Sequence, residues 1–155
     1  VRLEDVSFTY TGYDRSLFQN VNLHLDEGET IAISGTNGSG KSTLLGLMMG
    51  LLLPSEGRVL IDGENIWEFD AVSLRSQVVY LPLFDEANTF LDQKSDALLL
   101  DLLREYRGNC SMAIVSHRPS FLALADRSYQ IRGLGLHEIT NGARASLERL
   151  EKEYA

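Results

Sequence analysis

Two segments near the start of the chain place apolar residues at every second position. The first contains Val6, Phe8 and Tyr10, and the second contains Val21, Leu23 and Leu25. This period of two is the pattern of strands with one buried face, so we expect the chain to open with β structure. An Asp62-Gly63 turn inside the segment 58–66 predicts a hairpin that completes a small antiparallel sheet with the opening strands.

Short apolar runs alternate with helical patterns after residue 30. The runs at 30–34, 112–116 and 128–131 predict strands, and the segments 42–49 and 94–107 predict helices. We also expect a short helix from Asp70 to residue 75, a strand at 77–81 and a helix starting at Pro119. Leu147, Leu150 and Tyr154, at spacings of three and four, predict a terminal amphipathic helix. This alternation predicts an α/β fold with a mainly parallel sheet flanked by helices, and the antiparallel strands form an annex at its N-terminal side.

The composition narrows the class of partner. The chain has 155 residues, which is a single-domain length, with a formal net charge of -8 and a pI near 4.8. Nucleic acids and anionic membranes repel such a chain, so we expect neither as a partner, although a small anion can still bind to local backbone amides. No apolar run approaches the roughly 20 residues that cross a bilayer, and no signal-peptide pattern is present, so membrane association should come through a partner.

Two smaller observations concern the compartment and the limits of the chain. Cys110 is the one cysteine of the sequence, which excludes an internal disulfide and favours a reducing compartment. We interpret it as an ordinary core or surface thiol. The chain begins with Val1, already in strand-like sequence, which suggests a piece of a longer protein.

The strongest motif lies between the apolar run at 30–34 and the helix at 42–49. Residues 35–42 read Gly-Thr-Asn-Gly-Ser-Gly-Lys-Ser and fit the pattern G-x-x-x-x-G-K-[ST] of a phosphate-binding loop. Glycines let backbone amides curl around phosphate oxygens, and the start of the following helix adds positive potential. Lys41 should reach the β and γ phosphates, and the Ser42 hydroxyl should ligate Mg²⁺. The alternative is a glycine-rich turn without a ligand, and the position between a strand and a helix speaks against it.

Extended by Thr43 and Leu44, this loop resembles that of the nucleotide-binding domain of ABC transporters, and later segments agree in the family's order. Residues 83–92, Leu-Phe-Asp-Glu-Ala-Asn-Thr-Phe-Leu-Asp, resemble its Walker B and D-loop stretch. Residues 114–119, Ile-Val-Ser-His-Arg-Pro, resemble its switch-histidine loop, and residues 124–127 match the segment that follows. The resemblance implies a P-loop NTPase (RecA-like) fold that binds ATP and Mg²⁺. The sequences of residues 85–89 and 116–120 resemble those of peptide or protein exporters of the type I secretion kind most.

The resemblance also assigns site residues. Those that bind ATP are Tyr10, Gly35, Thr36, Asn37, Gly38, Ser39, Gly40, Lys41, Ser42 and Thr43. Ser42 and Asp85 should hold Mg²⁺, because a hard dication prefers oxygen ligands. The catalytic set is Lys41, Glu86, which should orient or deprotonate the attacking water, and His117, which can hydrogen-bond a γ-phosphate from the end of a strand. A lone histidine at a strand end is more often structural, so this last assignment depends on the family match.

Four of the matched residues have alternatives. Asp85-Glu86 would be a solvated acidic turn if no phosphate loop were present. Tyr10 falls where the family places an aromatic ring that stacks on adenine, and Tyr13 is the competing ring, because loop length decides which one reaches the base. Asp92 resembles the D-loop aspartate, which acts across a dimer, and a cap for the helix beginning near residue 94 explains it almost as well.

The junction between residues 82 and 83 departs from the family's pattern. Residues 77–82 resemble the strand that leads into the family's Q-loop, whereas 83–86 resemble the end of a different strand. Parallel neighbours in a sheet need a crossover of about a dozen residues or more, so both strands cannot take their family positions across one peptide bond. In the family this interval carries the Q-loop glutamine, a helical subdomain and the Leu-Ser-Gly-Gly-Gln signature, which this sequence lacks. Either that segment exists and is left out of the sequence, which we favour, or the protein is shortened by design.

The expected function is therefore that of an ABC-type ATPase domain formed by residues 1–155. Two such domains, identical or different, should sandwich ATP and drive a transmembrane partner from the cytoplasmic face of a membrane. Hydrolysis by this chain should be low, because the signature of an opposing subunit normally completes each site. One alternative is a small-molecule kinase or GTPase, but no guanine-reading Asn-Lys-x-Asp motif occurs, and Asp85-Glu86 fits hydrolysis better than transfer to a bound acceptor. The others are a non-catalytic nucleotide-binding module and a chromosome-type ABC ATPase head, and the acidic charge and the residues 116–120 disfavour the latter.

Overall fold

The computed structural model describes residues 1–70, 93–116 and 118–139, with the backbone alone for 93–96. The chain divides into two compact units. The first comprises Val1–Leu25, Gly35–Pro82 and Ile131–His137, and the second comprises Asp26–Ser34, Leu83–Gln130 and Glu138–Ala155. Within the described ranges, no helix has the length and apolar character needed to cross a membrane.

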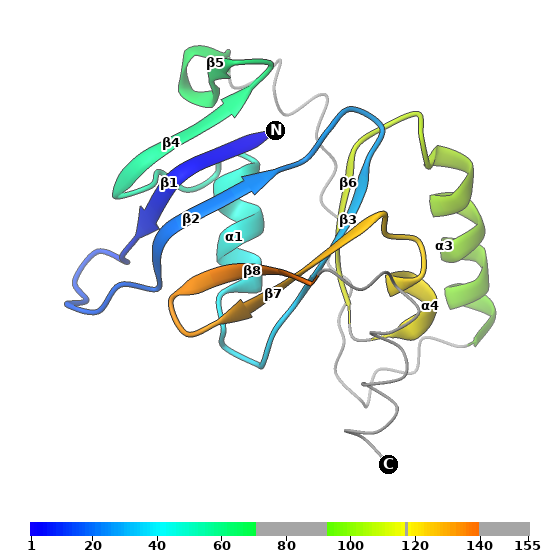
Figure 1. The fold of residues 1–155 in the computed structure, drawn as a ribbon. Coiled ribbons are helices and arrows are strands. Elements are labelled where there is room, and N and C mark those ends of the chain that lie inside the picture. Colours follow the sequence, from blue (N-terminus) through cyan, green and yellow to red (C-terminus); the bar gives the residue numbers. More distant parts are fainter. Residues whose placement is uncertain (71–92, 117, 140–155) are drawn as a thin grey trace. The chain divides into compact units, whose positions relative to one another are not determined.

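An antiparallel sheet of order β2-β1-β4-β5 lies in the first unit (Figure 1). Its strands are β1 (Arg2–Phe8), β2 (Phe18–His24), β4 (Glu56–Ile61) and β5 (Glu64–Asn65), and the short helix η1 (Ile66–Glu68) follows. Leu3 of β1 lies opposite Leu23 on one side and Val59 on the other, and all three side chains are buried. In β2, Val21 and Leu23 are buried at alternate positions, as predicted, whereas β1 has irregular register and buries Ser7 between Val6 and Phe8.

The β4–β5 hairpin turns at the predicted dipeptide. Asp62 and Gly63 have φ angles of 52° and 86°, which are the positive values that a tight two-residue hairpin turn requires. Helix α1 (Lys41–Met48) belongs to the same unit, and its residues Leu44 and Leu47 are fully buried. The helix predicted at 42–49 is therefore confirmed, one residue displaced.

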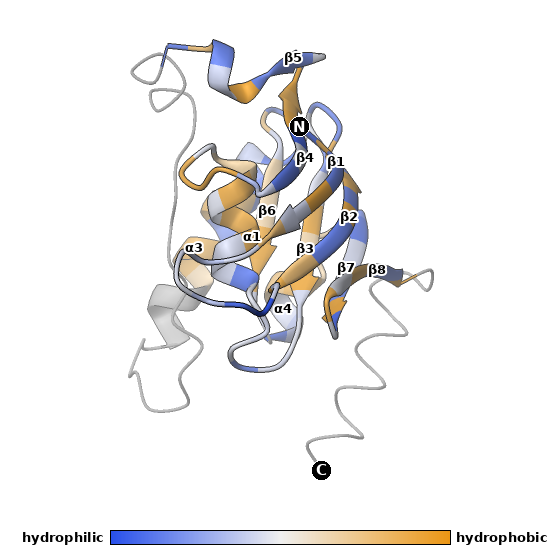
Figure 2. Ribbon diagram, turned by 90° about the vertical axis from the view of Figure 1, so that its left-hand side faces the viewer, coloured by the Kyte–Doolittle hydropathy of each residue, from blue (hydrophilic) through white to orange (hydrophobic). Residues whose placement is uncertain are grey.

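A second sheet has the strand order β6-β3-β7-β8. Its strands are β3 (Thr30–Ser34), β6 (Met112–Val115), β7 (Arg127–Arg132) and β8 (Gly135–Ile139). The central strand β3 pairs in parallel with both β6 and β7, so that Ala32 lies opposite Ile114 and Ser128. Four of its five residues are buried, as expected of a parallel strand covered on both faces. Figure 2 shows the hydropathy of this strand and of its neighbours.

Two helices contribute to the core of the second unit. They are α3 (Gln93–Tyr106) and α4 (Pro119–Leu122), and α4 begins with proline in its first turn, as predicted. Ile114, Phe121 and Leu124 form a buried cluster, and the partly buried Leu99, Leu100 and Leu103 of α3 pack against it. Cys110, just beyond α3, is a free and exposed thiol, in agreement with the interpretation of an ordinary surface cysteine.

The predicted α/β class is confirmed, with differences in detail. Strand β8 was not predicted, because its segment lacks a clear alternation of apolar and polar residues. Strand β1 ends at Phe8, so Tyr10 lies beyond the strand instead of within it. The predicted helix after Asp70, the strand at 77–81, the junction between 82 and 83 and the amphipathic helix near the C-terminus lie outside the described residues.

Candidate nucleotide-binding site

The phosphate loop follows β3 and requires glycine where it enters α1. Gly40 has a φ of 99°, in the left-handed region that side chains other than glycine rarely adopt. A Cβ atom at this position would lie 2.7 Å from Cζ of Phe18 and 3.0 Å from Cδ2 of Leu17. Because Phe18 is fully buried, its ring cannot move aside easily. The last glycine of the motif therefore brings the loop backbone close to the core of the first unit.

A turn inside the loop carries a polar group that suits an oxygen-rich ligand. The amide of Ser39 donates to the carbonyl of Thr36 at 3.1 Å. The Ser39 hydroxyl is buried and has no hydrogen-bond partner among the described residues. A Cβ atom on Gly35 would lie 2.6 Å from that hydroxyl, so the loop closes tightly at its base. Buried polar atoms normally have a partner, and a phosphate oxygen would provide one.

The Lys41 side chain hydrogen-bonds to the backbone at the start of the phosphate loop. Its Nζ atom donates to the carbonyl oxygens of Gly35 at 2.7 Å and Thr36 at 3.0 Å. The ammonium group is therefore held against the same loop that the sequence assigns to phosphate binding. A bound triphosphate would compete for these hydrogen bonds or share them, because an ammonium group has three donors.

The first turn of α1 is free of acidic side chains, and no side chain caps it among the described residues. The N-terminal amides of a helix lack intrahelical partners and carry a partial positive charge, so they attract anions. Ser42, in this first turn, is exposed and carries a hydroxyl oxygen. Oxygen donors of this kind fit Mg²⁺.

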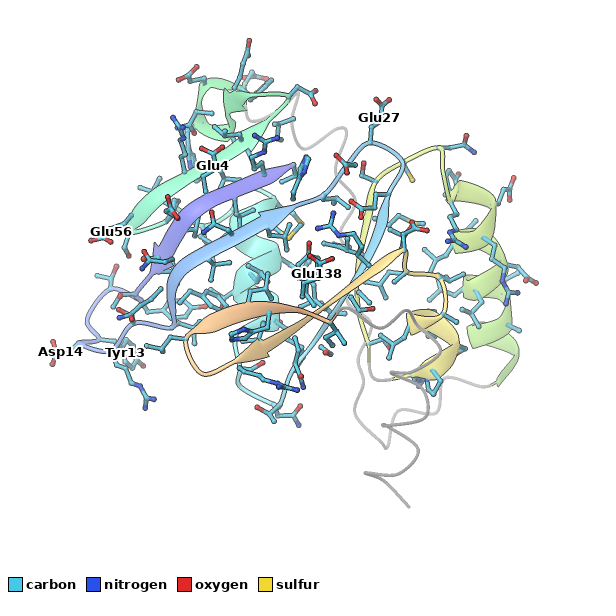
Figure 3. All side chains as sticks on the ribbon, in the orientation of Figure 1. Glu4, Tyr13, Asp14, Glu27, Glu56 and Glu138 are labelled. Carbon is cyan, nitrogen blue, oxygen red and sulfur yellow. The ribbon has the colours of Figure 1, made fainter. Side chains whose placement is uncertain are left out.

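Tyr10 contacts the same helix. Its phenol oxygen lies 2.7 Å from Oγ1 of Thr43, so the structure brings together two residues that the resemblance assigns to ATP binding. The competing ring, Tyr13, is 72% exposed, and Figure 3 shows it beside Asp14 at the tip of the loop between β1 and β2. The Tyr10–Thr43 contact was not predicted, because a bond between hydroxyls 33 positions apart leaves no local pattern in the sequence.

The remaining predicted site residues lie outside the part of the chain that the structure describes. Asp85, Glu86 and Asp92 lie in the range 71–92, and His117 is likewise outside the described residues. In the second unit, Ser116 is 2% exposed and its Oγ accepts a hydrogen bond from the amide of Arg118 at 3.0 Å. The chain on both sides of position 117 is thus tied together by a short side-chain turn.

Asp126 is a further anchor in the second unit, within the matched segment 124–127. Its carboxylate accepts from the Thr30 amide at 2.9 Å and from the Arg107 guanidinium at 2.5 Å. Burial of the carboxylate opposes its ionisation, but these two hydrogen bonds and the charge of Arg107 together hold the pKa of Asp126 below its ordinary value of 3.8. The role of this residue is to fix the start of two strands.

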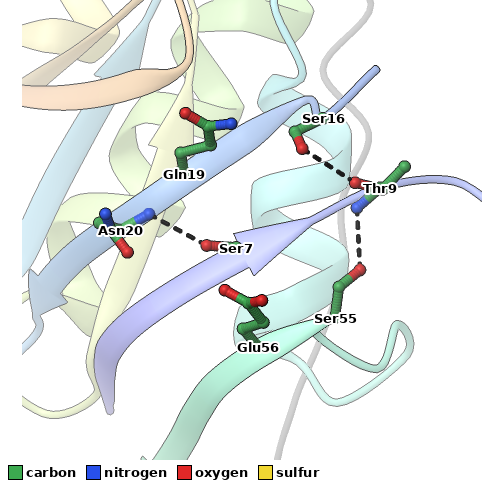
Figure 4. Close-up of a pocket in the computed structure, with 7 residues that line it drawn as sticks. All are labelled: Ser7, Thr9, Ser16, Gln19, Asn20, Ser55 and Glu56. Carbon is green, nitrogen blue, oxygen red and sulfur yellow. Dashed lines mark hydrogen bonds between the residues drawn. The ribbon is translucent and has the colours of Figure 1, made fainter. Parts of the chain in front are cut away.

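A separate polar pocket of about 210 Å³ lies in the first unit (Figure 4). Its lining is Ser7, Thr9, Ser16, Gln19, Asn20, Ser55 and Glu56. The hydroxyls already bond one another or the backbone: Thr9 donates to Ser16 at 3.1 Å, and Ser55 accepts from the Thr9 amide at 3.0 Å. With a carboxylate and no cationic side chain in its lining, this pocket does not suit a phosphate.

Comparisons with known proteins agree with the motifs. The family model described as ABC transporter matches residues 18–148, well over half of the chain. A Clostridium acetobutylicum protein named as an ABC transporter ATP-binding protein is 42% identical over 99 residues, which are 64% of this chain and 39% of that protein. The ATP-dependent lipid A-core flippase of Escherichia coli K12 is 41% identical over 78 residues, which are 50% of this chain and 13% of the flippase.

A comparison of the fold with solved structures gives the same result as the sequence comparisons. The solved structure of a bacterial Atm1-family ABC exporter with ATP bound aligns with a TM-score of 0.79 at 20% identity, over 99% of this chain and 41% of that chain. This chain therefore spans less than half the length of each of these three proteins. The family match over residues 18–148 and the identities to these relatives show that the chain belongs to the ABC transporter family, as an ATP-binding domain homologous to those of exporters.

Proposed function

We propose that this chain binds ATP with Mg²⁺ and, paired with a second ATP-binding domain, powers export through a transmembrane partner at the cytoplasmic face of a membrane. The observation that carries the proposal is the loop from Gly35 to Ser42. Among the described residues, it combines a helix start that no side chain caps, a lysine held at the loop and a buried hydroxyl without a hydrogen-bond partner. Each of these features favours a polyphosphate anion.

Each residue of the site has a distinct task in this proposal. The amides of the loop and of the first turn of α1 bind phosphate oxygens, and Lys41 neutralises charge on the β and γ phosphates. Ser42 and Asp85 would hold Mg²⁺, which when bound neutralises phosphate charge. Glu86 orients or deprotonates the attacking water, and His117 donates a hydrogen bond to the terminal phosphate.

The domain organisation belongs to the same proposal. We infer that residues 1–155 form one ATP-binding domain whose helical subdomain and signature are missing at the junction between 82 and 83. Since the signature of an opposing domain closes each ATP site in the family, complete function requires a partner that carries it. The acidic net charge of -8 supports a protein partner over a nucleic acid.

Calorimetric titration with MgATP tests the proposal, using the parent chain, Lys41→Ala and Arg58→Ala. Loss of Lys41 removes a charge-assisted contact, so we expect ATP affinity to fall by about tenfold or more. Arg58 is the matched control, because it carries one positive charge in β4 and bonds Glu4 at 2.7 Å. Its variant should keep the parental affinity. Equal binding by the parent and Lys41→Ala, with both proteins folded, would refute the phosphate assignment.

A further inference from the structure

The contact between Tyr10 and Thr43 joins two parts of the proposed ATP site. The phenol oxygen and Oγ1 lie 2.7 Å apart, a good hydrogen-bond distance at which either atom can be the donor. Tyr10 lies two residues beyond β1, and Thr43 lies in the first turn of α1, directly after the phosphate-loop motif. The resemblance puts the base of the nucleotide at the first residue and the phosphates beside the second.

The two partners differ in how firmly they are held. Thr43 is 6% exposed and belongs to a helix, so its hydroxyl has a fixed position. Tyr10 is 45% exposed and belongs to a loop. Its ring meets Phe8 edge to face, with the ring centroids 4.8 Å apart at 84°. The ring is therefore held by Phe8 at one contact and by Thr43 at its hydroxyl, while much of the residue stays exposed.

We propose that Thr43 is a positioning residue for Tyr10: its hydroxyl holds the phenol so that the ring is ready to stack on the base before a nucleotide binds. The inference deepens the proposed function and rests on it. Helix α1 then serves both ends of the nucleotide, with its backbone at the phosphates and its Thr43 side chain behind the base-stacking ring.

The physical reason is conformational entropy. An exposed ring on a loop samples several rotamers, and fixing one of them on binding reduces the affinity. A hydrogen bond from a buried helix residue fixes that rotamer in the free protein instead. Removal of either hydroxyl should therefore weaken binding of a ligand with a base, and removal of the Tyr10 hydroxyl should leave binding of a bare triphosphate unchanged.

The test titrates MgATP and magnesium tripolyphosphate into Tyr10→Phe, Thr43→Val, Thr43→Ser and the double variant of Tyr10→Phe with Thr43→Val. We expect each loss of a hydroxyl to weaken ATP binding about two- to tenfold, which corresponds to one neutral hydrogen bond. The double variant should be no weaker than the single variants, and Thr43→Ser should keep the parental affinity. Tripolyphosphate should bind equally well to the parent and to Tyr10→Phe, because the proposal places Tyr10 at the base and not at the phosphates.

Two matched controls remove a hydroxyl elsewhere in the same loop. Tyr13→Phe keeps an aromatic ring, and Thr9→Val removes the hydroxyl that bonds Ser16 at 3.1 Å. Both should bind ATP and tripolyphosphate as the parent does.

Three results would overturn the inference alone. They are losses that multiply in the double variant, a loss by Tyr10→Phe toward tripolyphosphate as large as its loss toward ATP, and parental ATP affinity in both single variants. A parent chain that binds no ATP would instead overturn the proposed function, and the inference would fall with it.

Discussion

Thr30 and Asp126 are joined by two hydrogen bonds in opposite directions. The Thr30 amide donates to the Asp126 carboxylate at 2.9 Å, and the Asp126 amide donates to the Thr30 carbonyl at 2.7 Å. Thr30 begins β3, and Asp126 directly precedes β7, so this pair sets the register at the start of two parallel strands. Arg107 holds the carboxylate from the end of α3.

Acid should weaken this anchor. The pKa of Asp126 is lowered in the folded protein, against the effect of its burial, by the Thr30 amide and by Arg107. A carboxyl group with a depressed folded pKa stabilises the fold above its unfolded pKa, and this contribution disappears as the pH falls through the folded pKa. We therefore expect part of the unfolding free energy to be lost below about pH 4, and Asp126→Asn to remove this part of the pH dependence.

Denaturant unfolding between about pH 7 and pH 3 would measure this effect. The size should be modest, because the Arg107 and Asp126 side chains are 43% and 41% exposed and solvent screens them. Asp101→Asn is a suitable control, since Asp101 also pairs with an arginine, Arg104 at 3.0 Å within α3, and its side chain is 72% exposed. The prediction fails if Asp126→Asn and the parent lose stability in parallel throughout this pH range.

Two glycines of the phosphate loop should respond differently to a methyl group. Gly38 and Gly40 both have positive φ, at 77° and 99°, so alanine strains the backbone at each, by about 1–2 kcal/mol. A Cβ atom meets nothing within 4 Å at Gly38, but it lies 2.7 Å from the buried Phe18 ring at Gly40. Gly40→Ala should therefore lower the unfolding free energy by about 1–3 kcal/mol more than Gly38→Ala does.

Equilibrium unfolding of the two variants, side by side, measures that difference. ATP titration should follow the same order, because a displaced Gly40 moves the amides at the start of α1. Equal destabilisation of the two variants would show that the loop moves away from Phe18 at little cost.

The strand, loop and helix at 30–48 could be predicted because each part has a local signal. The apolar run, the glycine spacing and the Lys-Ser pair all lie within a few residues of one another. The antiparallel strands likewise follow from a period of two and one turn dipeptide. Local patterns of this kind identify elements and the residues of a motif.

Contacts between distant residues could not be predicted in this way. Asp126 lies 96 positions from Thr30, and Tyr10 lies 33 positions from Thr43, so neither pair leaves a periodic trace in the sequence. The hydrogen bonds of Lys41 to Gly35 and Thr36 depend on the three-dimensional curl of the loop. Strand β8 was missed for a related reason, because its place beside β7 depends on sheet pairing and not on its own alternation.

Measurement of ATP turnover would distinguish hydrolysis by this chain from ATP binding. The sequence lacks the signature that completes an opposing site, so we expect bound ATP to be hydrolysed slowly and without cooperativity. Glu86→Gln removes the proposed water-activating carboxylate and should reduce the residual single-turnover rate by about 100-fold, while ATP affinity stays parental. Glu105→Gln, at an exposed position of α3, is the control with the same chemical change and should leave the rate unaltered. Cooperative, multiple-turnover hydrolysis by the parent chain would contradict the prediction, because it would mean that residues present in this sequence already complete the site.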